Sequence, residues 1–139
     1  MNKLLSSSMV FLLLSNGAVA TAEFDVRAHY ARSVHKIPVR DGIKLHTVVY
    51  RPKGDSQSYP FLMVRTPYSA SHPNGLEEFL PRERMAPSDE FLEDGYIFVF
   101  QDGRGTHQSE GEWINLRPIS TDEDGTDEAT DTYDTIEWL

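Results

Sequence analysis

Hydrophobic and polar residues alternate along residues 34–51, the first clearly patterned stretch of the chain. Before the pair Asp41-Gly42, Ile37 and Val39 share one face. After it, another face is shared by Ile43, Leu45, Thr47 and Val49. An Asp-Gly pair between two alternating runs predicts a β-hairpin whose two turn residues both adopt positive φ.

Two later segments, residues 61–64 and 96–100, are apolar without interruption. Short continuous runs of this kind are typical of strands buried on both faces of a parallel sheet. Parallel strands need a crossover connection, and residues 87–95 predict a short helix with acids in its first turn and Gly95 at the left-handed exit. The intervening residues 69–87 are interrupted by several prolines and are expected to be irregular.

The last segment, residues 126–139, has a helical period. We expect Asp124 to be its N-cap, with Asp127 and Glu128 in the first turn, where the helix dipole favours acids. No Gly, Pro or basic residue marks its end, so we expect a pattern that has been cut rather than finished. These elements together predict the α/β class, with a hairpin leading into an incomplete, mostly parallel sheet. One face of the final helix carries Ala129, Tyr133, Ile136 and Leu139.

Residues 1–22 have the features of a secretory signal peptide, with Lys3 before a short apolar run and small residues up to Ala22. Cleavage is expected after Ala20 or Ala22. A retained membrane anchor is the alternative, but the run is shorter than the roughly 20 apolar residues that span a bilayer. We therefore expect residues 23–139 to form one periplasmic or secreted unit without a membrane anchor.

The composition limits the partners of this unit. The chain has 13 Lys and Arg residues against 22 Asp and Glu residues, for a formal charge of −9, and it has no cysteine. Nucleic acid and anionic membranes are not expected partners, because both require clustered positive charge. Without disulfides, the folded unit must be held together by packing.

Four stretches together resemble one family of α/β-hydrolases, which includes α-amino-acid ester hydrolases, cocaine esterase and Xaa-Pro dipeptidyl-peptidases. The first two stretches read V-R-D-G-I-K-L-H-T-V-V-Y-R-P (39–52) and V-R-T-P-Y (64–68). The others read G-Y-I-F-V-F-Q-D-G-R-G-T-H-Q-S-E-G-E-W (95–113) and D-E-A-T-D-T-Y-D-T-I-E-W-L (127–139). The resemblance covers residues 34–139, and Arg117-Pro118 with the signal peptide favours the α-amino-acid ester hydrolase branch.

The resemblance implies the N-terminal half of an α/β-hydrolase fold and an exported serine hydrolase without a cofactor. Its substrate would be a small acyl ester or amide of an α-amino acid, cleaved through an acyl-enzyme, and the full-length protein could form a homo-oligomer. An Xaa-Pro dipeptidyl-peptidase is the alternative within the family. Tyr68, the tyrosine of the P-Y pair, would donate its hydroxyl to the oxyanion hole.

The other catalytic residues of that family are expected beyond Leu139. No G-x-S-x-G nucleophile motif occurs in the sequence, and neither Ser69 nor Ser109 is flanked by the glycines that such a turn requires. An α/β-hydrolase takes its triad in the order Ser, Asp or Glu, His, so the histidines here come too early. Residues 23–139 alone are therefore expected to be inactive. The five histidines are His29, His35, His46, His72 and His107.

Asp102-Gly103-Arg104-Gly105 follows the second apolar run, where ligand sites of open α/β sheets are found. Arg104 could bind a substrate carboxylate or line the acyl pocket. The interpretation that we favour is structural, with Arg104 paired to a nearby acid such as Asp102 or Glu110. His107 is expected to be a loop residue rather than a ligand.

The acidic residues 122–134 raise the question of calcium. Aligned on a calcium-binding loop with Gly125 at the sixth position, Asp122 and Asp124 fall at the third and fifth. Ser120 and Asp131 then occupy the first and twelfth positions, where Asp and Glu are expected, so no metal site is predicted. A secreted acidic binding module, complete as it stands, is the rival interpretation. It predicts cooperative folding of residues 23–139, whereas the hydrolase interpretation predicts an exposed sheet edge and a poorly ordered last helix.

Overall fold

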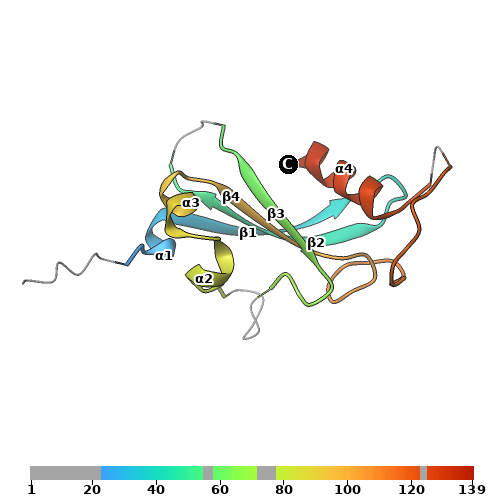
Figure 1. The fold of residues 1–139 in the computed structure, drawn as a ribbon, viewed down its shortest axis with the longest axis horizontal. Helices are drawn as coiled ribbons and strands as arrows, with labels where there is room; N and C mark the ends of the chain where they lie inside the picture. Colours follow the sequence, from blue (N-terminus) through green and yellow to red (C-terminus); the bar gives the residue numbers. More distant parts are fainter. Residues whose placement is uncertain (1–22, 55–57, 72–77, 123–124) are drawn as a thin grey trace, which may run out of the picture.

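The computed structural model describes residues 23–54, 58–71, 78–122 and 125–139. The predicted signal peptide, His72 and Asp124 lie outside these ranges. The described residues form one four-stranded sheet in the order β1-β2-β4-β3, with helices on both faces (Figure 1). Within these ranges, no helix combines the length and hydrophobicity needed to cross a bilayer. The elements are α1 (Val26–His29), β1 (Tyr30–Pro38), β2 (Lys44–Pro52), β3 (Phe61–Thr66), α2 (Arg82–Met85), α3 (Asp89–Glu93), β4 (Ile97–Asp102) and α4 (Glu128–Trp138).

The hairpin of β1 and β2 is present, but its turn differs from the prediction. The amide of Val39 donates to the carbonyl of Ile43 (2.9 Å) and that of Gly42 to the carbonyl of Val39 (2.8 Å), which encloses a three-residue loop. Gly42 alone in this loop adopts positive φ, at 84°, so the expected two-residue turn is wrong. This pattern matches a turn followed by one left-handed residue, in which Asp41 needs no unusual backbone conformation.

The hairpin register also corrects the predicted faces. Ile37 lies directly opposite Leu45 in the antiparallel ladder. Directly paired side chains point to the same side of a sheet. The two apolar sets of the hairpin therefore share one face of the sheet rather than two, because the odd-numbered loop keeps both sets in phase.

β3 and β4 pair in parallel, as predicted, from Phe61 opposite Ile97 to Thr66 opposite Asp102. β4 is central, between β2 and β3, and it is buried over nearly its whole length. The expectation of a buried β3 is wrong, since β4 is its only partner among the described strands. The exposed fractions of Phe61 and Val64 are accordingly 37% and 49%. The exposed edge that the hydrolase interpretation predicts is therefore present at β3.

The crossover between β3 and β4 contains the predicted helix, α3, with Asp89 and Glu90 in its first turn. Gly95 follows it with φ of 76°, and its amide closes the helix on the carbonyl of Leu92 (3.2 Å). The short helices α1 and α2 were not predicted, and α2 lies in the segment that was expected to be irregular. Each has four residues, which is too short for a helical period to show in the sequence.

One face of the sheet packs against α1, α2 and α3 through an apolar cluster. Tyr30 belongs to this cluster, and its hydroxyl donates to the carbonyls of Leu92 (3.1 Å) and Tyr96 (3.0 Å). Burial raises the pKa of Tyr30 to about 12, so this donor keeps its proton. The buried cluster comprises Val26, Tyr30, Val48, Tyr50, Ala70, Leu80, Met85, Ala86, Leu92, Phe98 and Phe100.

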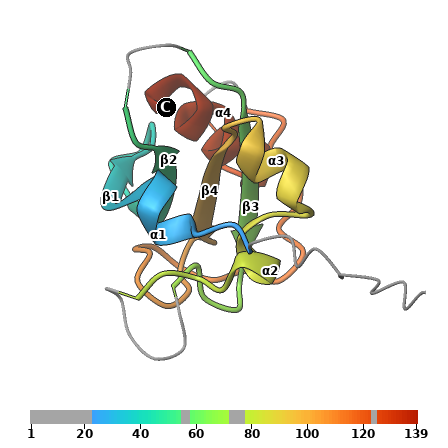
Figure 2. The same cartoon turned by 90° about the vertical axis from the view of Figure 1, so that its left-hand side faces the viewer.

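α4 covers the opposite face of the sheet (Figures 1 and 2). Its N-cap is Asp127, which forms a capping box with Thr130, so the placement of Asp127 in the first turn is wrong. The residues of α4 that are buried are the polar Asp131 and Thr135. The apolar face predicted from the sequence, Ala129, Tyr133, Ile136 and Leu139, is exposed. α4 is a regular helix rather than a poorly ordered segment, because polar contacts attach it to the sheet.

A glycine in the turn after β4 gives a test of this fold. A Cβ on Gly105, which has φ of 69°, would lie 2.1 Å from the backbone nitrogen of Trp113, whereas one on Gly42 would meet nothing within 4 Å. We expect Gly42→Ala to cost about 1–2 kcal/mol of unfolding free energy through backbone strain alone. Gly105→Ala should cost clearly more, because strain and a backbone clash combine. Denaturant unfolding followed by tryptophan fluorescence measures both, and equal losses would contradict the described turn.

Candidate active site

The loops that follow β3 and β4 lie side by side at the carboxyl edge of the sheet. They do so because the two parallel strands end opposite each other, at Thr66 and Asp102. The amide of Gly103 donates to the carbonyl of Thr66 (3.0 Å), and His107 Nε2 donates to the carbonyl of Pro67 (2.9 Å). We call residues 67–71 the Tyr68 loop and residues 103–109 the β4 loop. This junction is where ligands bind in open α/β sheets.

Tyr68 lies in the first turn of its loop. Its backbone amide donates to Thr66 Oγ1 (3.0 Å), and the next residue, Ser69, has φ of 82°. The side chain of Tyr68 is 86% exposed, so it is not a packing residue of the described core. Its hydroxyl is available to a ligand at the carboxyl edge of the sheet.

The serines near this edge are held in structural hydrogen bonds. Ser69 Oγ accepts from the amide of Ser71 (3.2 Å). Ser109 Oγ donates to the carbonyl of Asp102 (2.8 Å) and accepts from the amide of His46 (2.9 Å). Neither hydroxyl has a histidine ring as a hydrogen-bond partner in the contacts of the described residues. These positions agree with the sequence, which gave neither serine the surroundings of a nucleophile.

A histidine–serine pair that the sequence analysis missed lies beneath the loops. His46 Nε2 and Ser71 Oγ share a hydrogen bond of 3.1 Å. The two residues are only 2% and 5% exposed, so no substrate reaches them in this structure. Burial lowers the pKa of His46, and the nearby charge of Asp102 opposes that shift. The pair therefore serves the packing of the Tyr68 loop rather than catalysis.

The other described histidines fall into two groups. His107 is in the β4 loop, as expected, with φ of 45°. His29 and His35 belong to α1 and β1, and β1 is at the opposite edge of the sheet from β3. His35 packs against Trp138, with ring centroids 4.9 Å apart. Of these three histidines, His107 alone lies in one of the two loops that form the junction.

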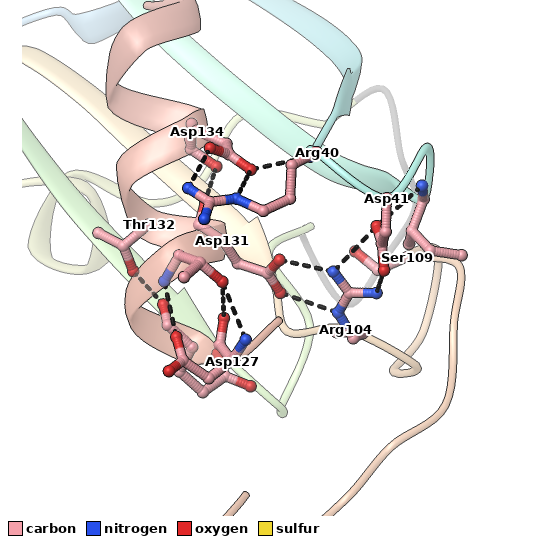
Figure 3. A network of polar contacts seen from close by, with 12 residues as sticks. Arg40, Asp41, Arg104, Ser109, Asp127, Asp131, Thr132 and Asp134 are labelled. Carbon is pink, nitrogen blue, oxygen red and sulfur yellow. Dashed lines mark hydrogen bonds and ion pairs between the residues drawn. The ribbon is translucent and has the colours of Figure 1, made fainter. Parts of the chain in front are cut away.

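Arg104 forms a buried ion pair that differs from the sequence prediction (Figure 3). Its guanidinium donates to both oxygens of Asp131 (3.0 and 2.6 Å) and to both oxygens of Asp41 (2.6 and 3.3 Å). The side chains of Arg104 and Asp131 are 6% and 1% exposed. Asp102 and Glu110, the partners predicted from the sequence, are wrong, because their carboxylates accept hydrogen bonds from other groups. Asp102 accepts from backbone amides, and Glu110 accepts from the amide of Lys44 (3.0 Å).

The electrostatics of this pair favour the structural interpretation of Arg104. The hydrogen bonds with Asp131 and Asp41 raise the pKa of Arg104, and the hydrogen bond from Arg104 lowers the pKa of Asp41. Two bidentate carboxylates on one guanidinium leave little capacity to bind a substrate carboxylate. Arg104 connects the β4 loop with the hairpin loop and with α4.

A second polar group lies between α4 and the sheet. Arg65 donates to Gln101 Oε1 (2.8 and 2.6 Å) and to Thr132 Oγ1 (2.9 Å). Gln101 Nε2 in turn donates to Thr47 Oγ1 (2.9 Å) and Thr135 Oγ1 (3.1 Å). Burial lowers the pKa of Arg65, and the negative charge of Glu128 acts in the opposite direction and raises it. Sequence reasoning missed these residues, although two polar side chains within otherwise apolar strands were a visible signal.

Beside the Tyr68 loop there is an open cavity of about 530 Å³. The side chains of Trp113, Ile114 and Leu116 form an apolar wall, and Thr66 and Pro67 form the side nearest Tyr68. The charged side chains of Arg65, Arg117 and Glu128 also line this cavity, so its walls are only partly apolar.

No metal centre is found among the described residues, where no group of three or more His, Cys, Asp or Glu side chains is arranged to hold an ion. The aligned calcium loop would need Asp131 as its twelfth ligand. Both oxygens of Asp131 are instead bonded to Arg104.

Residues 41–139 match the X-Pro dipeptidyl-peptidase (S15) family. The chain belongs to this family. Over 103 residues it is 34% identical to the cocaine esterase of Rhodococcus sp. (strain MB1 Bresler), a match that covers 74% of this chain and 15% of the esterase. The chain thus spans only a small part of the length of this relative.

Solved structures of related proteins contain the same fold. An α-amino acid ester hydrolase matches with a TM-score of 0.65 and 36% identity, over 93% of this chain and 22% of that one. An aminopeptidase from a marine sediment Thaumarchaeota archaeon matches with a TM-score of 0.64 and 35% identity, over 94% and 22%. A CocE/NonD family hydrolase from Staphylococcus aureus matches with a TM-score of 0.52 and 28% identity, over 78% and 20%. The α/β class and the family resemblance are therefore confirmed.

The buried pair of Arg104 can be tested with two carboxylate-to-amide changes. Asp131→Asn leaves a buried guanidinium without one of its two carboxylates and should lower the unfolding free energy by about 3 kcal/mol. The control Glu78→Gln changes an exposed pair with Arg27, whose side chains are 51% and 62% exposed, and should cost less than about 1 kcal/mol. Both are measured by denaturant unfolding. Similar small losses for the two variants would show that α4 does not depend on Asp131.

The lowered pKa values of Asp41 and Asp134 predict an acid dependence of stability. Each carboxylate is held in its charged form by an arginine, Arg104 and Arg40 respectively. A group whose pKa is lower in the folded state stabilises the fold above its unfolded pKa of about 4 and loses this contribution as the pH falls further. Unfolding free energy should therefore decrease below about pH 4. Asp134→Asn should make that decrease shallower, and an unchanged pH profile would contradict the assignment.

Proposed function

We propose that this chain supplies the N-terminal part of a serine hydrolase that cleaves esters or amides of α-amino acids through an acyl-enzyme. Membership of the S15 family supports this proposal, as does the similarity to an α-amino acid ester hydrolase and to an aminopeptidase. The serine, the histidine and the acid of the triad would come from the remainder of the protein. The part of the active site within this chain is the junction of the Tyr68 and β4 loops.

The observation that carries the proposal is the position of Tyr68, which follows a parallel strand and presents an exposed hydroxyl at its carboxyl end. Attack of the serine on the carbonyl of the substrate creates a tetrahedral intermediate with negative charge on the former carbonyl oxygen. The Tyr68 hydroxyl donates a hydrogen bond to that oxygen, together with the backbone amide that follows the nucleophile. A donor that is already in place stabilises the charge more strongly than mobile water does.

An Xaa-Pro dipeptidyl-peptidase is the second candidate, favoured by the description of the matched family. Both candidates use the same oxyanion donor, so they differ only in acyl and leaving group. A panel that contains a p-nitrophenyl ester of an α-amino acid and an Xaa-Pro p-nitroanilide distinguishes them in the full-length protein. A binding module would turn over neither substrate.

We also propose that the hydrolase acts outside the cytoplasm. The pattern of residues 1–22 supports export, which would place the enzyme in the periplasm or the medium. A small-molecule ester or amide is the partner that the family supports, and the charge of −9 argues against nucleic acid and anionic membranes.

Tyr68→Phe in the full-length hydrolase tests the proposed role. The change keeps the ring and removes the hydroxyl, so kcat should fall by about 10²- to 10³-fold while KM changes little. Tyr133→Phe is the matched control, since Tyr133 is an exposed tyrosine on α4, and it should leave kcat unchanged. A loss of stability with kcat preserved would identify Tyr68 as a packing residue and contradict the proposal.

A further inference from the structure

The carboxylate of Asp102 is buried without a basic ion-pair partner in the described part of the chain. Asp102 is the last residue of β4 and is 0% exposed. The neighbouring Arg104, which could have paired with it, is bonded to Asp41 and Asp131. Burial of a carboxylate is costly unless its oxygens are well satisfied by hydrogen bonds. The contacts of Asp102 therefore show what the buried group stabilises.

The two oxygens of Asp102 accept hydrogen bonds from two different loops. Oδ1 accepts from the amide of Ala70 in the Tyr68 loop (2.6 Å). Oδ2 accepts from the amide of Gln108 in the β4 loop (3.0 Å). Hydrogen bonds to a charged acceptor are about twice as strong as neutral ones. One side chain thus links the two loops that form the junction.

The Tyr68 loop needs such a fixed point. Ser69 adopts φ of 82°, a left-handed conformation that costs a residue with a side chain roughly 1–3 kcal/mol and persists only when its surroundings impose it. The Asp102 contact falls on Ala70, directly after this residue, and the Thr66 hydroxyl holds the amide of Tyr68 directly before it. The backbone on both sides of Ser69 is therefore anchored. This backbone sets the direction in which the exposed Tyr68 side chain leaves the loop.

We infer that Asp102 is the positioning residue of the oxyanion hole, which directs the Tyr68 hydroxyl by holding the amide of Ala70 against the β4 loop. This inference rests on the proposed function of Tyr68 and adds a residue to it. His107 supports the same geometry with its hydrogen bond from Nε2 to the carbonyl of Pro67. Asp102 does not touch the substrate, and it acts on the reaction through Tyr68.

Asp102→Asn in the full-length hydrolase tests the inference. The amide keeps the shape of the side chain but offers one acceptor oxygen, so one of the two loop contacts is lost. We expect kcat to fall about tenfold with KM nearly unchanged, because a small displacement of a catalytic donor is sufficient to slow the reaction. Hydrogen exchange of the peptide that covers residues 67–71 should become faster. In the Tyr68→Phe background, the same change should lower kcat less than about twofold.

Two further variants keep the test decisive. Asp134→Asn removes a largely buried carboxylate whose partner, Arg40, lies in neither loop of the junction, and it should change kcat by the same factor with and without the Tyr68 hydroxyl. If Asp102→Asn does not fold, His107→Asn is the alternative. It removes the hydrogen bond from His107 to the carbonyl of Pro67 at an exposed position, and asparagine tolerates the positive φ of that position. We expect a kcat loss of about threefold that disappears in the Tyr68→Phe background.

The outcomes separate the two proposals. If Tyr68→Phe leaves kcat unchanged, the proposed function of Tyr68 fails, and the positioning role fails with it. If Tyr68→Phe lowers kcat but Asp102→Asn lowers it equally in both backgrounds, the oxyanion donor stands and Asp102 is only a stabilising residue. Non-additive kcat losses with faster exchange in residues 67–71 support the inference.

Discussion

The structure depends on the two ion pairs that the buried Arg104 forms with Asp41 and Asp131. Asp41 comes from the hairpin loop, Asp131 from α4 and Arg104 from the loop after β4, so three segments that are distant in the sequence meet at one guanidinium. A planar group with donors on two edges can bind two carboxylates at once, which a lysine could not do with the same geometry. Removal of these charges from water is costly, and the cost is offset only while all three segments hold their positions. The pair therefore makes the position of α4 sensitive to the hairpin loop.

The two faces of the sheet are held by different physical interactions. Side chains such as Phe98 and Phe100 point from β4 into the apolar cluster under α1, α2 and α3. The alternate residue, Gln101, points to α4, where it bonds with Arg65, Thr47 and Thr135. Apolar packing tolerates small changes of angle, whereas hydrogen bonds and ion pairs require defined directions. The strands also bury apolar side chains on the α4 face, among them Ile37, Leu45 and Val99, but the buried residues of α4 itself are polar.

The sequence predicted the elements whose signals are local. Alternation and the Asp-Gly pair predicted the hairpin, but the choice of a three-residue loop depends on Gly42 alone taking positive φ, which the dipeptide does not reveal. The helical period of α4 was visible, yet it marked the exposed face, because an apolar period does not state which neighbour it meets. The buried face of α4 was not predicted, because its buried residues, Asp131 and Thr135, are polar and the prediction looked for apolar residues. The partners of Arg104 could not be predicted either, since Asp41 is 63 residues away and local acids were more obvious.

The candidate site shows the same division between local and long-range information. Only the family resemblance identified Tyr68, since a tyrosine after a strand has no catalytic signature of its own. Asp102 was considered as a partner for Arg104 because it is near in sequence, whereas its actual partners are amides of two loops. The charged side chains of Arg104 and Asp131 position α4. The carboxylate of Asp102, which among the described residues accepts from backbone amides, positions Tyr68. Among the described residues, the exposed hydroxyl of Tyr68 has no charged hydrogen-bond partner, as a donor that must respond to a developing oxyanion requires.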